Sequence, residues 1–445
     1  MHLKYFGTDG IRGVVGDVLT TKLAFRIGRY LGYDSGGRRR RILIGRDTRA
    51  SGDLLMTALA NGMILSGADV FDAGVTSTPS ISYLVVEKVF DFGIMISASH
   101  NPFYDNGIKI FNHEGEKISD AIEKDIELYI DAEEDYLPKA TYEDIGRLIY
   151  APHLVDSYVD FLYKKGKGIK SNFRIAVDCA NGSASSIAPK IFNQLDVRAS
   201  FIHNVPNGIN INDNCGSTHP ECLIEKIKTK KYDVGFAFDG DSDRVLLVSP
   251  EGELIDGDAI IYLNALNMAR RGKLKNNAVA LTVMSNLGVK QALKKQGISV
   301  VETAVGDKYV QQTLKEKNLS LGGEQSGHII FADDLLTGDG ILTAIKVLKT
   351  MHFENKSLAE LLKDFQKYPQ VLINVPVTDK KQVMEDEALA KLIKEVDDAL
   401  GEEGRLLVRA SGTENLIRVM AEAIDKGKCE AAVNKVVTFI KNTFE

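Results

Sequence analysis

The sequence predicts an α/β protein with three homologous mixed α/β domains and a smaller C-terminal α+β domain around a central cleft. Two observations carry this prediction. Short apolar runs alternate with amphipathic stretches in a pattern that recurs three times over residues 41–331. Each copy also has a loop of small polar residues at the same point. Such alternation is typical of βαβ units, and repeated units indicate homologous domains.

Each copy is expected to contain three strands, a polar loop after the third, and a short returning strand. Apolar positions at helical spacing also predict helices over 53–65 and 339–351. Each range below holds a predicted strand, most with the turn or loop that follows it, and the returning strand comes last in each copy. The ranges are 41–52, 67–74, 91–102 and 106–111; 174–185, 197–208, 233–244 and 245–249; 278–288, 298–307, 319–328 and 329–331.

The C-terminal region does not follow this repeat. Its pattern predicts strands at 371–377, 405–409 and 416–420 and helices at 382–400 and 428–443. Proline and charged residues mark breaks near 150 and 368. We therefore expect four domains, at 1–150, 151–253, 254–367 and 368–445.

Composition excludes several classes of protein. The 445 residues hold 55 Lys and Arg and 61 Asp and Glu, a formal net charge of −6, which disfavours a general nucleic-acid binder. No apolar run approaches the ~20 residues that span a bilayer, and the first twenty residues lack the apolar stretch of a signal peptide. The four cysteines form no CxxC pair. We expect a cytoplasmic protein with reduced thiols and neither membrane nor nucleic-acid partners.

The loop after the third strand of the second copy, DGDSDR, is the strongest chemical signal. It places Asp239, Asp241 and Asp243 at alternating positions, and such clustered hard oxygen ligands suit Mg²⁺ or Ca²⁺. Arg244 follows directly and can pair with a phosphate. A solvated acidic turn is the alternative explanation.

The matching loop of the first copy, SASHNP, combines Ser99 and His100, with Lys109 on the returning strand. A hydroxyl beside an imidazole suggests an activated nucleophile, but there is no GxSxG elbow of a hydrolase. With a metal loop at the equivalent position of the next copy, phosphoryl chemistry on Ser99 fits better than a capped turn.

Further polar loops could bind a sugar phosphate. GEQSGH places Glu324 and Ser326 between glycines, where their oxygens could hold sugar hydroxyls. RASGTEN suggests an anion site, and GTDGIRG places Arg12 where it could reach a reacting phosphate. By contrast, we interpret GRDTRASG, with Arg46 and Arg49, as a structural loop held by Arg–Asp pairs. The residues predicted for the anion site are Arg409, Ser411, Gly412, Thr413 and Arg418.

These motifs, in this order, resemble the α-D-phosphohexomutase superfamily over essentially the full chain. VDCANG at 177–182, NINDNCGSTHPE at 210–221 and GGEQSGHII at 322–330 point to its glucosamine-phosphate branch. The resemblance implies four domains around a central cleft and an isomerase that interconverts glucosamine 6-phosphate and glucosamine 1-phosphate. Glucosamine 1,6-bisphosphate is the implied intermediate, and this or glucose 1,6-bisphosphate the implied activator. A homodimer is also expected.

The resemblance also implies roles for single residues. Ser99 would be the phosphoserine and would hold Mg²⁺ together with Asp239, Asp241 and Asp243. His100 and Lys109 match residues that assist proton transfer, and Arg12 matches one that steadies the phosphate. The phosphate loop departs from the family at Ala410 and Asn415, where proline is commoner, and the metal loop at Ser242, where glycine is commoner. Substrate-binding roles fall on Arg244, Glu324, Ser326, Arg409, Ser411, Gly412, Thr413 and Arg418.

Three alternatives remain open at this point. The same chemistry could act on glucose or mannose phosphates. A Mg²⁺-dependent phosphatase could use an aspartate of DGDSDR as its nucleophile and would not need Ser99. A sugar-phosphate sensor could keep the cleft without turnover, although the intact Ser99 and aspartates argue against it.

Overall fold

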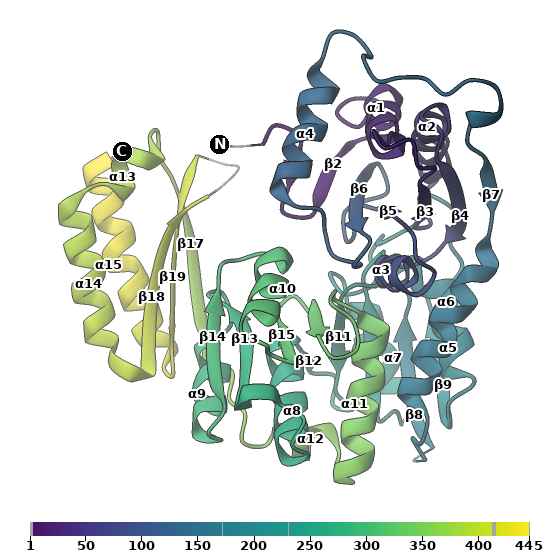
Figure 1. Cartoon of the computed structure of the whole chain (residues 1–445). Helices are drawn as coiled ribbons and strands as arrows, with labels where there is room; N and C mark the ends of the chain where they lie inside the picture. The colour runs from purple at the N-terminus through teal and green to yellow at the C-terminus, as the bar shows by residue number, and fades with distance from the viewer. Residues whose placement is uncertain (1–2, 171, 230, 412–414, 445) are drawn as a thin grey trace. The chain divides into compact units, whose positions relative to one another are not determined.

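The computed structural model describes residues 3–170, 172–229, 231–411 and 415–444 (Figure 1). The chain divides into two units. The first comprises Met1–Met284 and Ile298–Leu362, and the second comprises Ser285–Gly297 and Lys363–Glu445. No helix within the described residues combines the length and the apolar character needed to cross a membrane.

The described part of the first unit contains three sheets that share one strand order. A first strand pairs in parallel with a second strand on one side and a third strand on the other, and the returning strand pairs antiparallel with the third. This common order confirms the predicted threefold repeat. The strands, sheet by sheet in the order first, second, third and returning, are β3 (Arg41–Arg46), β4 (Asp69–Val75), β5 (Phe92–Ile96) and β6 (Asp105–Asn112); β8 (Phe173–Asp178), β9 (Val197–Ile202), β10 (Val234–Phe238) and β11 (Val245–Val248); β13 (Ala278–Thr282), β14 (Ser299–Thr303), β15 (Leu321–Gly323) and β16 (Ile329–Phe331).

Short strands extend two of these sheets at their edges. The first sheet runs β1-β2-β6-β5-β3-β4-β7, and the second runs β12-β11-β10-β8-β9. The added strands are β1 (Phe6–Gly7), β2 (Gly10–Val14), β7 (Leu148–Tyr150) and β12 (Leu254–Ile255).

Helices cover these sheets (Figure 1). The predicted helices at 53–65 and 339–351 are confirmed as α2 and α11. The helices of the first unit are α1 (Thr21–Gly32), α2 (Gly52–Leu65), α3 (Thr78–Glu87), α4 (Asp120–Asp131), α5 (Val155–Gly166), α6 (Ala184–Phe192), α7 (Glu221–Thr229), α8 (Gly257–Arg270), α10 (Asp307–Glu316), α11 (Gly340–Glu354) and α12 (Leu358–Leu362).

Strand β3 shows how the first sheet is buried on both faces. Ile42 and Ile44 are fully buried in a cluster with apolar residues of α1 and α2. Leu43, between them, is fully buried in another cluster with residues of α3. Because successive side chains of a strand point to opposite faces, a continuous apolar run fills two cores at once.

The second unit is a small α+β domain. Its antiparallel sheet has the order β17-β19-β18, from β17 (Gln370–Pro376), β18 (Gly404–Ala410) and β19 (Leu416–Ala423). The single helix predicted at 382–400 is wrong, because the chain forms two helices there. Asp386 lies between them and accepts a hydrogen bond from the Leu389 N–H, so it caps a new helix. The helices of this unit are α9 (Leu287–Lys295), α13 (Lys380–Met384), α14 (Glu387–Leu400) and α15 (Lys426–Phe444).

The N-terminus of α11 carries a buried carboxyl group. Asp339 caps the helix by accepting the Leu342 N–H at 2.9 Å, and it also accepts a hydrogen bond of 2.7 Å from the Tyr158 hydroxyl. Burial raises the pKa of Asp339 to about 7, despite these hydrogen bonds. The folded chain therefore binds a proton that the unfolded chain releases near pH 4. Stability should fall as pH rises through this window.

We expect Asp339→Asn to remove this pH dependence. Asparagine is an equally good N-cap and can donate to the Tyr158 hydroxyl. The variant should be more stable than the parent by about 1–3 kcal/mol at about pH 8, and the gain should shrink at about pH 5. Urea unfolding at the two pH values measures this difference. Asp160→Asn, at an exposed position of α5, is the control and should change stability little. An equal loss of stability at both pH values for Asp339→Asn would contradict the interpretation.

Candidate active site

The three polar loops of the repeat meet in the first unit. The hydroxyl of Ser99, after β5, donates a hydrogen bond of 2.6 Å to Asp239, after β10. The backbone of Arg244 pairs as an antiparallel bridge with that of His328, at the end of the loop between β15 and β16. Since each loop follows the third strand of its sheet, the repeat itself brings the loops together.

The loop after β10 forms an acidic triad of Asp239, Asp241 and Asp243. All three carboxylates are buried, and one oxygen of each lies within 4.8 Å of the others. Oδ1 of Asp241 and Oδ1 of Asp243 are buried and accept no hydrogen bond from the described residues. Buried carboxylate oxygens without donors are costly, so the donor set fits a hard divalent cation.

Electrostatic coupling within the acidic triad is strong. Burial and the charges of Asp243 and Asp241 raise the pKa of Asp239 well above its usual range. Burial also opposes the charge of Asp243, but Lys109, His328 and Arg244 outweigh it and lower the pKa of Asp243 to about 2. The pKa values of crowded carboxylates move apart in this way unless a cation neutralises their charge.

Ser99 is fully buried and sits in a left-handed backbone conformation with φ of 53°. Its N–H donates to the Ser97 hydroxyl at 2.9 Å, and its own hydroxyl faces Asp239. A left-handed conformation is uncommon for serine and persists only where the surroundings fix it. The loop therefore holds the Ser99 hydroxyl at the acidic triad.

The ring of His100 lies between Ser99 and Arg244. Its Nδ1 is 3.3 Å from the Ser99 hydroxyl and 3.3 Å from a guanidinium nitrogen of Arg244. Burial, with the charges of Arg244 and Arg12, lowers the pKa of His100 to about 4. The ring is therefore neutral at neutral pH and accepts at Nδ1.

Lys109 supplies a fixed positive charge to the site. Its Nζ lies 2.7 Å from Asp241, 3.2 Å from Asp243 and 3.0 Å from Asp9. Burial opposes the charge of Lys109, but these carboxylates outweigh it and raise its pKa well above the usual range. Asp9 also pairs with Arg12, which joins the predicted phosphate-steadying arginine to the same network.

The loop between β15 and β16 contributes Glu324 and Ser326. The Glu324 carboxylate accepts the Gly306 N–H at 3.2 Å, and its charge acts on Arg244. Ser326 is exposed. The predicted sugar-binding loop is thus beside the metal loop, with Glu324 directed toward Arg244.

The predicted phosphate loop belongs to the second unit. Arg409 and Arg418 are directly opposed on β18 and β19, and burial and Arg418 lower the pKa of Arg409. The Ser411 N–H bonds to the Leu416 carbonyl at 2.9 Å. Two guanidinium groups on one hairpin suit an anion. The predicted residues Gly412 and Thr413 lie outside the described residues.

Sequence reasoning missed two residues that support the reacting loops. Thr78, at the start of α3, donates its hydroxyl to the Asp241 carboxylate at 2.5 Å and its N–H to the Asp241 carbonyl at 3.0 Å. Lys117, which is partly buried, pairs with Asp9 and Asp307. Thr78 follows the second strand of the first sheet, so its position at a strand end is the signal that could have identified it.

Two further side chains hold the backbone of the Ser99 loop. Arg49 donates to the carbonyls of Ser99 and Asn101 at 3.2 and 2.6 Å, and the Asn212 amide donates to the same two carbonyls at 2.9 and 3.0 Å. Arg49 also pairs with Asp47, which confirms the predicted Arg–Asp pairing of its loop. This double clamp fixes the left-handed turn at Ser99.

The segment that carries Asn212 is itself anchored to the second sheet. Asp178 accepts hydrogen bonds from the Gly216 N–H at 3.1 Å and from His203 at 3.0 Å. The Cys215 sulfur lies within 4.8 Å of both side chains. The motifs around Asp178 and Cys215 therefore position Asn212 against the reacting loop.

Four domain families match the chain in order. They are described as phosphoglucomutase/phosphomannomutase α/β/α domains I, II and III, over residues 3–137, 156–252 and 256–368, and the C-terminal domain, over 372–438. The chain belongs to the phosphoglucomutase/phosphomannomutase family. It is thus an isomerase of the phosphohexomutase superfamily.

Relatives within this family are similar over the whole chain. A phosphoglucosamine mutase of Bacillus subtilis strain 168 is 47% identical over 441 residues, which cover 99% of this chain and 98% of that protein. A phosphoglucosamine mutase of Anoxybacillus flavithermus is 46% identical over 443 residues, 99% of each protein.

Solved phosphohexomutase structures share the fold. A phosphoglucomutase/phosphomannomutase family protein of Burkholderia thailandensis has a TM-score of 0.81 at 23% identity, over 98% of both chains. An N-acetylphosphoglucosamine mutase of Aspergillus fumigatus, solved with GlcNAc-6P and magnesium, has a TM-score of 0.70 at 18% identity, over 100% of this chain and 96% of that chain.

We expect Asn212→Ala to lower kcat about 10- to 100-fold, because it releases the Ser99 loop without removing a reacting group. The matched control is Asn214→Ala on the same loop. Both asparagines have positive φ, at 57° and 49°, so both alanines carry a similar backbone penalty. Among the residues that the structure describes, the Asn214 side-chain amide donates to its neighbour Asp213 and not to the Ser99 loop. Similar melting temperatures with unequal kcat values are expected, and equal kcat values would contradict the clamp.

Proposed function

We propose that the chain interconverts glucosamine 6-phosphate and glucosamine 1-phosphate, with Ser99 as a phosphoserine. The observation that carries this proposal is the Ser99 hydroxyl held 2.6 Å from Asp239 of the buried acidic triad. The full-length similarity to phosphoglucosamine mutases supports the choice of an amino sugar over glucose or mannose.

The proposed reaction has two phosphoryl transfers. First, the bond between phosphorus and the Ser99 oxygen breaks as a bond forms to O1 of glucosamine 6-phosphate. The O1 proton leaves, and the Ser99 oxygen regains a proton. The resulting 1,6-bisphosphate reorients, and the bond between phosphorus and O6 breaks as a bond forms to the Ser99 oxygen. The Ser99 hydroxyl loses its proton, and O6 gains one. Glucosamine 1-phosphate is released, and the phosphoserine is restored.

Charge and position account for most of the proposed catalysis, as in other phosphoryl transfers. A divalent cation held by Asp239, Asp241, Asp243 and the phosphoserine would neutralise charge on the transferring group. The charges of Arg244 and Arg12 both act on His100, next to Ser99, and supply positive charge there. Lys109 remains protonated and holds two of the aspartates in place.

Neutral His100 is the proposed acceptor of the sugar hydroxyl proton. Arg244 donates to its Nδ1 in the structure, so the ring proton would lie on Nε2 until substrate changes that contact. Lys109, with its raised pKa, is a poor base and would assist as a cation.

Substrate binding is proposed for the remaining loops. Glu324 and Ser326 would bind the sugar hydroxyls, and Arg244 a phosphate oxygen. The opposed guanidinium groups of the second unit would bind the phosphate that is not being transferred. The residues proposed for that loop are Arg409, Ser411, Gly412, Thr413 and Arg418.

The remaining features are proposed with the reaction. We propose Mg²⁺ as the metal, glucosamine or glucose 1,6-bisphosphate as activator, a homodimer, and a cytoplasmic protein that binds no nucleic acid. We also propose domain boundaries at 150, 253 and 367. The four family matches, at 3–137, 156–252, 256–368 and 372–438, support these boundaries.

We expect Ser99→Ala to lower kcat by at least ~10³-fold, because the phosphoryl carrier is lost. Ser82→Ala is the matched control. Ser82 is also buried and donates its hydroxyl to the Gly115 carbonyl, but it lies on α3 away from the acidic triad. Phosphoserine is measured by intact mass, and turnover by formation of glucosamine 1-phosphate. Normal turnover by Ser99→Ala would exclude the phosphoserine route and favour an aspartyl phosphatase.

The sugar is tested by kcat/KM, which measures discrimination between substrates. Glucosamine 6-phosphate, glucose 6-phosphate and mannose 6-phosphate are compared with Mg²⁺ and a bisphosphate primer. A preference for the amino sugar without phosphate release is expected. If another hexose phosphate is preferred, that sugar is the substrate of the same reaction. If phosphorylated protein turns over none of the three, the chain is a sugar-phosphate sensor.

Metal removal should abolish turnover, because nothing else among the described residues satisfies Oδ1 of Asp241 and Oδ1 of Asp243. We expect chelation to reduce kcat at least ~100-fold and added Mg²⁺ to restore it. Isothermal titration of Mg²⁺ should show weaker binding in Asp243→Asn, with Asp233→Asn as the surface control. Full activity in metal-free protein would contradict a metal role.

A further inference from the structure

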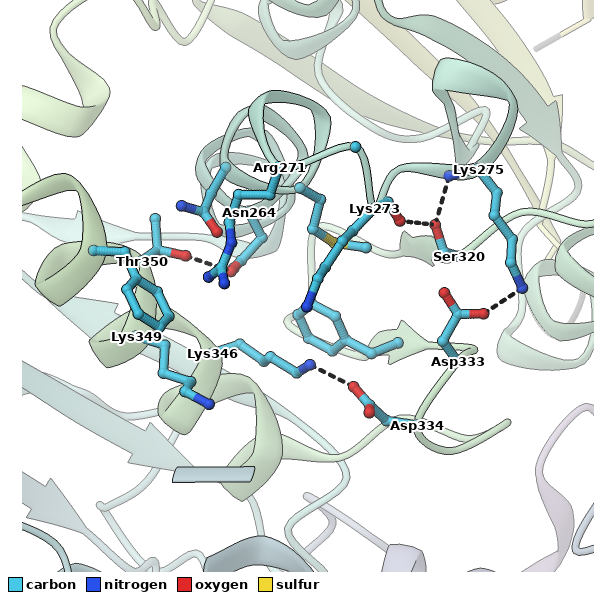
Figure 2. A pocket seen from close by; sticks show the side chains of 15 residues that line it. Asn264, Arg271, Lys273, Lys275, Ser320, Asp333, Asp334, Lys346, Lys349 and Thr350 are labelled. Carbon is cyan, nitrogen blue, oxygen red and sulfur yellow. Dashed lines mark hydrogen bonds and ion pairs between the residues drawn. The ribbon is translucent and has the colours of Figure 1, made fainter. Parts of the chain in front are cut away.

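A cavity of about 480 Å³ lies in the first unit, formed by residues of α8, α11 and β16 and the segments that follow α8 and β16 (Figure 2). None of its lining residues belongs to the loops described above. Cavities of this size hold small organic ligands, so its lining indicates what it could bind.

The lining is strongly cationic, although the chain as a whole carries a net charge of −6. Its charged residues are Arg271, Lys273, Lys275, Lys346 and Lys349, against Asp333 and Asp334. Lys346 pairs with Asp334 and Lys275 pairs with Asp333, as Figure 2 shows. The paired groups cancel, and three cations remain.

These three cations are Arg271, Lys273 and Lys349. Among the residues that the structure describes, no carboxylate lies within ion-pairing distance of any of them. Burial, together with the charges of Lys346, Arg271 and Lys273, lowers the pKa of Lys349. Cations that repel one another around a cavity create a site for an anion, which would stabilise all three charges.

The rest of the lining suits a ligand larger than an inorganic anion. The Arg271 guanidinium lies 4.1 Å from the centre of the Phe353 ring, and the Lys349 ammonium lies 5.9 Å from it. Asn267 and Thr350 add polar groups to the lining. An aromatic face beside a cluster of cations is the arrangement that binds a phosphate attached to an organic body.

A simpler explanation is that these cations only balance helix dipoles, since Arg271 and Lys349 lie near the carboxyl ends of α8 and α11. This explanation requires no cavity and no aromatic lining, and it predicts no ligand. The number of mutually repelling cations favours a bound anion instead.

The two helices that line the cavity, α8 and α11, begin beside the reacting loops. The N–H of Gly257, which begins α8, donates to the Gln325 carbonyl at 2.9 Å. The N–H of Gly340, which begins α11, donates to the Ser242 carbonyl at 2.9 Å. A ligand that displaced either helix would therefore move the sugar loop or the metal loop.

We infer that this cavity is a second ligand site, which binds a phosphorylated small molecule and through α8 and α11 alters the activity of the enzyme. The ligand class is defined by its phosphoryl group. A free polyphosphate and a nucleotide share that chemistry, and the probes below distinguish them. Binding at the cavity does not depend on which hexose phosphate the enzyme converts.

Binding is measured by isothermal titration with pyrophosphate and with adenosine monophosphate. The proteins are the parent chain, the double variant Arg271→Ala/Lys349→Ala, and Lys164→Ala, an exposed helical lysine that does not line the cavity. We expect at least one probe to bind the parent and Lys164→Ala alike, and to bind the double variant at least ~10-fold more weakly. Stronger binding of the nucleotide would identify a ligand with an aromatic body, and stronger binding of pyrophosphate a free polyphosphate.

Binding of the probe at the active site is tested with Arg409→Ala, which weakens the proposed phosphate loop. Binding that survives Arg409→Ala and is lost in the double variant supports the second site. Binding that is lost in Arg409→Ala and kept in the double variant belongs to the active site and overturns the inference, as does the absence of binding of both probes. Lys349→Arg should keep binding, which separates loss of charge from loss of folding.

Coupling to activity is measured with whichever hexose phosphate the enzyme converts. A probe that binds the cavity should change kcat/KM about 5-fold or more in the parent, and not in the double variant. The double variant alone should keep the basal kcat, because neither residue touches the reacting loops. Binding without any change in kcat/KM would overturn the regulatory part of the inference.

Discussion

The buried acidic triad is the constraint on which the rest of the active site depends. Three carboxylates within 4.8 Å of one another, all removed from water, would repel strongly and lose their hydration. Groups from several elements of the first unit balance these charges. Lys109 comes from the first sheet, Thr78 from the start of α3 and the Arg244 N–H from the metal loop itself. Removing any one of these contacts leaves a carboxylate that is buried and less well balanced.

This balance is incomplete in a specific way. Protein groups satisfy one oxygen of Asp241 and one of Asp243, while the second oxygen of each has no donor among the described residues. Lys109 therefore holds the carboxylates in place without filling the side on which the proposed divalent cation would bind. The permanent charge of Lys109 and the charge of the proposed divalent cation would thus act on different oxygens of the carboxylates. The same separation gives a reason for the rigid backbone at Ser99, since in the proposed reaction its phosphoryl group would have to meet the divalent cation.

The sequence predicts the repeat well because the repeat is a local pattern. Each apolar run, turn and polar loop is visible over a few residues, and the strand order that follows from three copies is the one the structure shows. The acidic triad and Ser99 were found for the same reason. The failure at 382–400 is also local in origin, because the first helix ends at Met384 and Asp386 caps a second one within a stretch whose apolar spacing continues.

Contacts between distant segments could not be predicted in this way. Asn212 is separated by more than a hundred residues from the Ser99 carbonyl it binds, and neither residue alone signals the other. Arg49 was interpreted only as one member of an Arg–Asp pair, although the same guanidinium also binds the reacting loop. Such residues have two partners, and a sequence pattern shows at most the nearer one.

The clamp also clarifies why Asn212 and Asn214 both stand at positive φ. A left-handed turn in this segment directs the Asn212 amide at two carbonyls of the Ser99 loop, and the Asp178 carboxylate fixes the segment from the other side. The second sheet thus acts on the reacting serine through two routes. Its third strand delivers Asp239 to the hydroxyl, and the segment after its second strand delivers Asn212 to the backbone. Because the second sheet holds both the Ser99 hydroxyl and one side of the clamp on its backbone, a shift of that sheet would move Asp239 and Ser99 together.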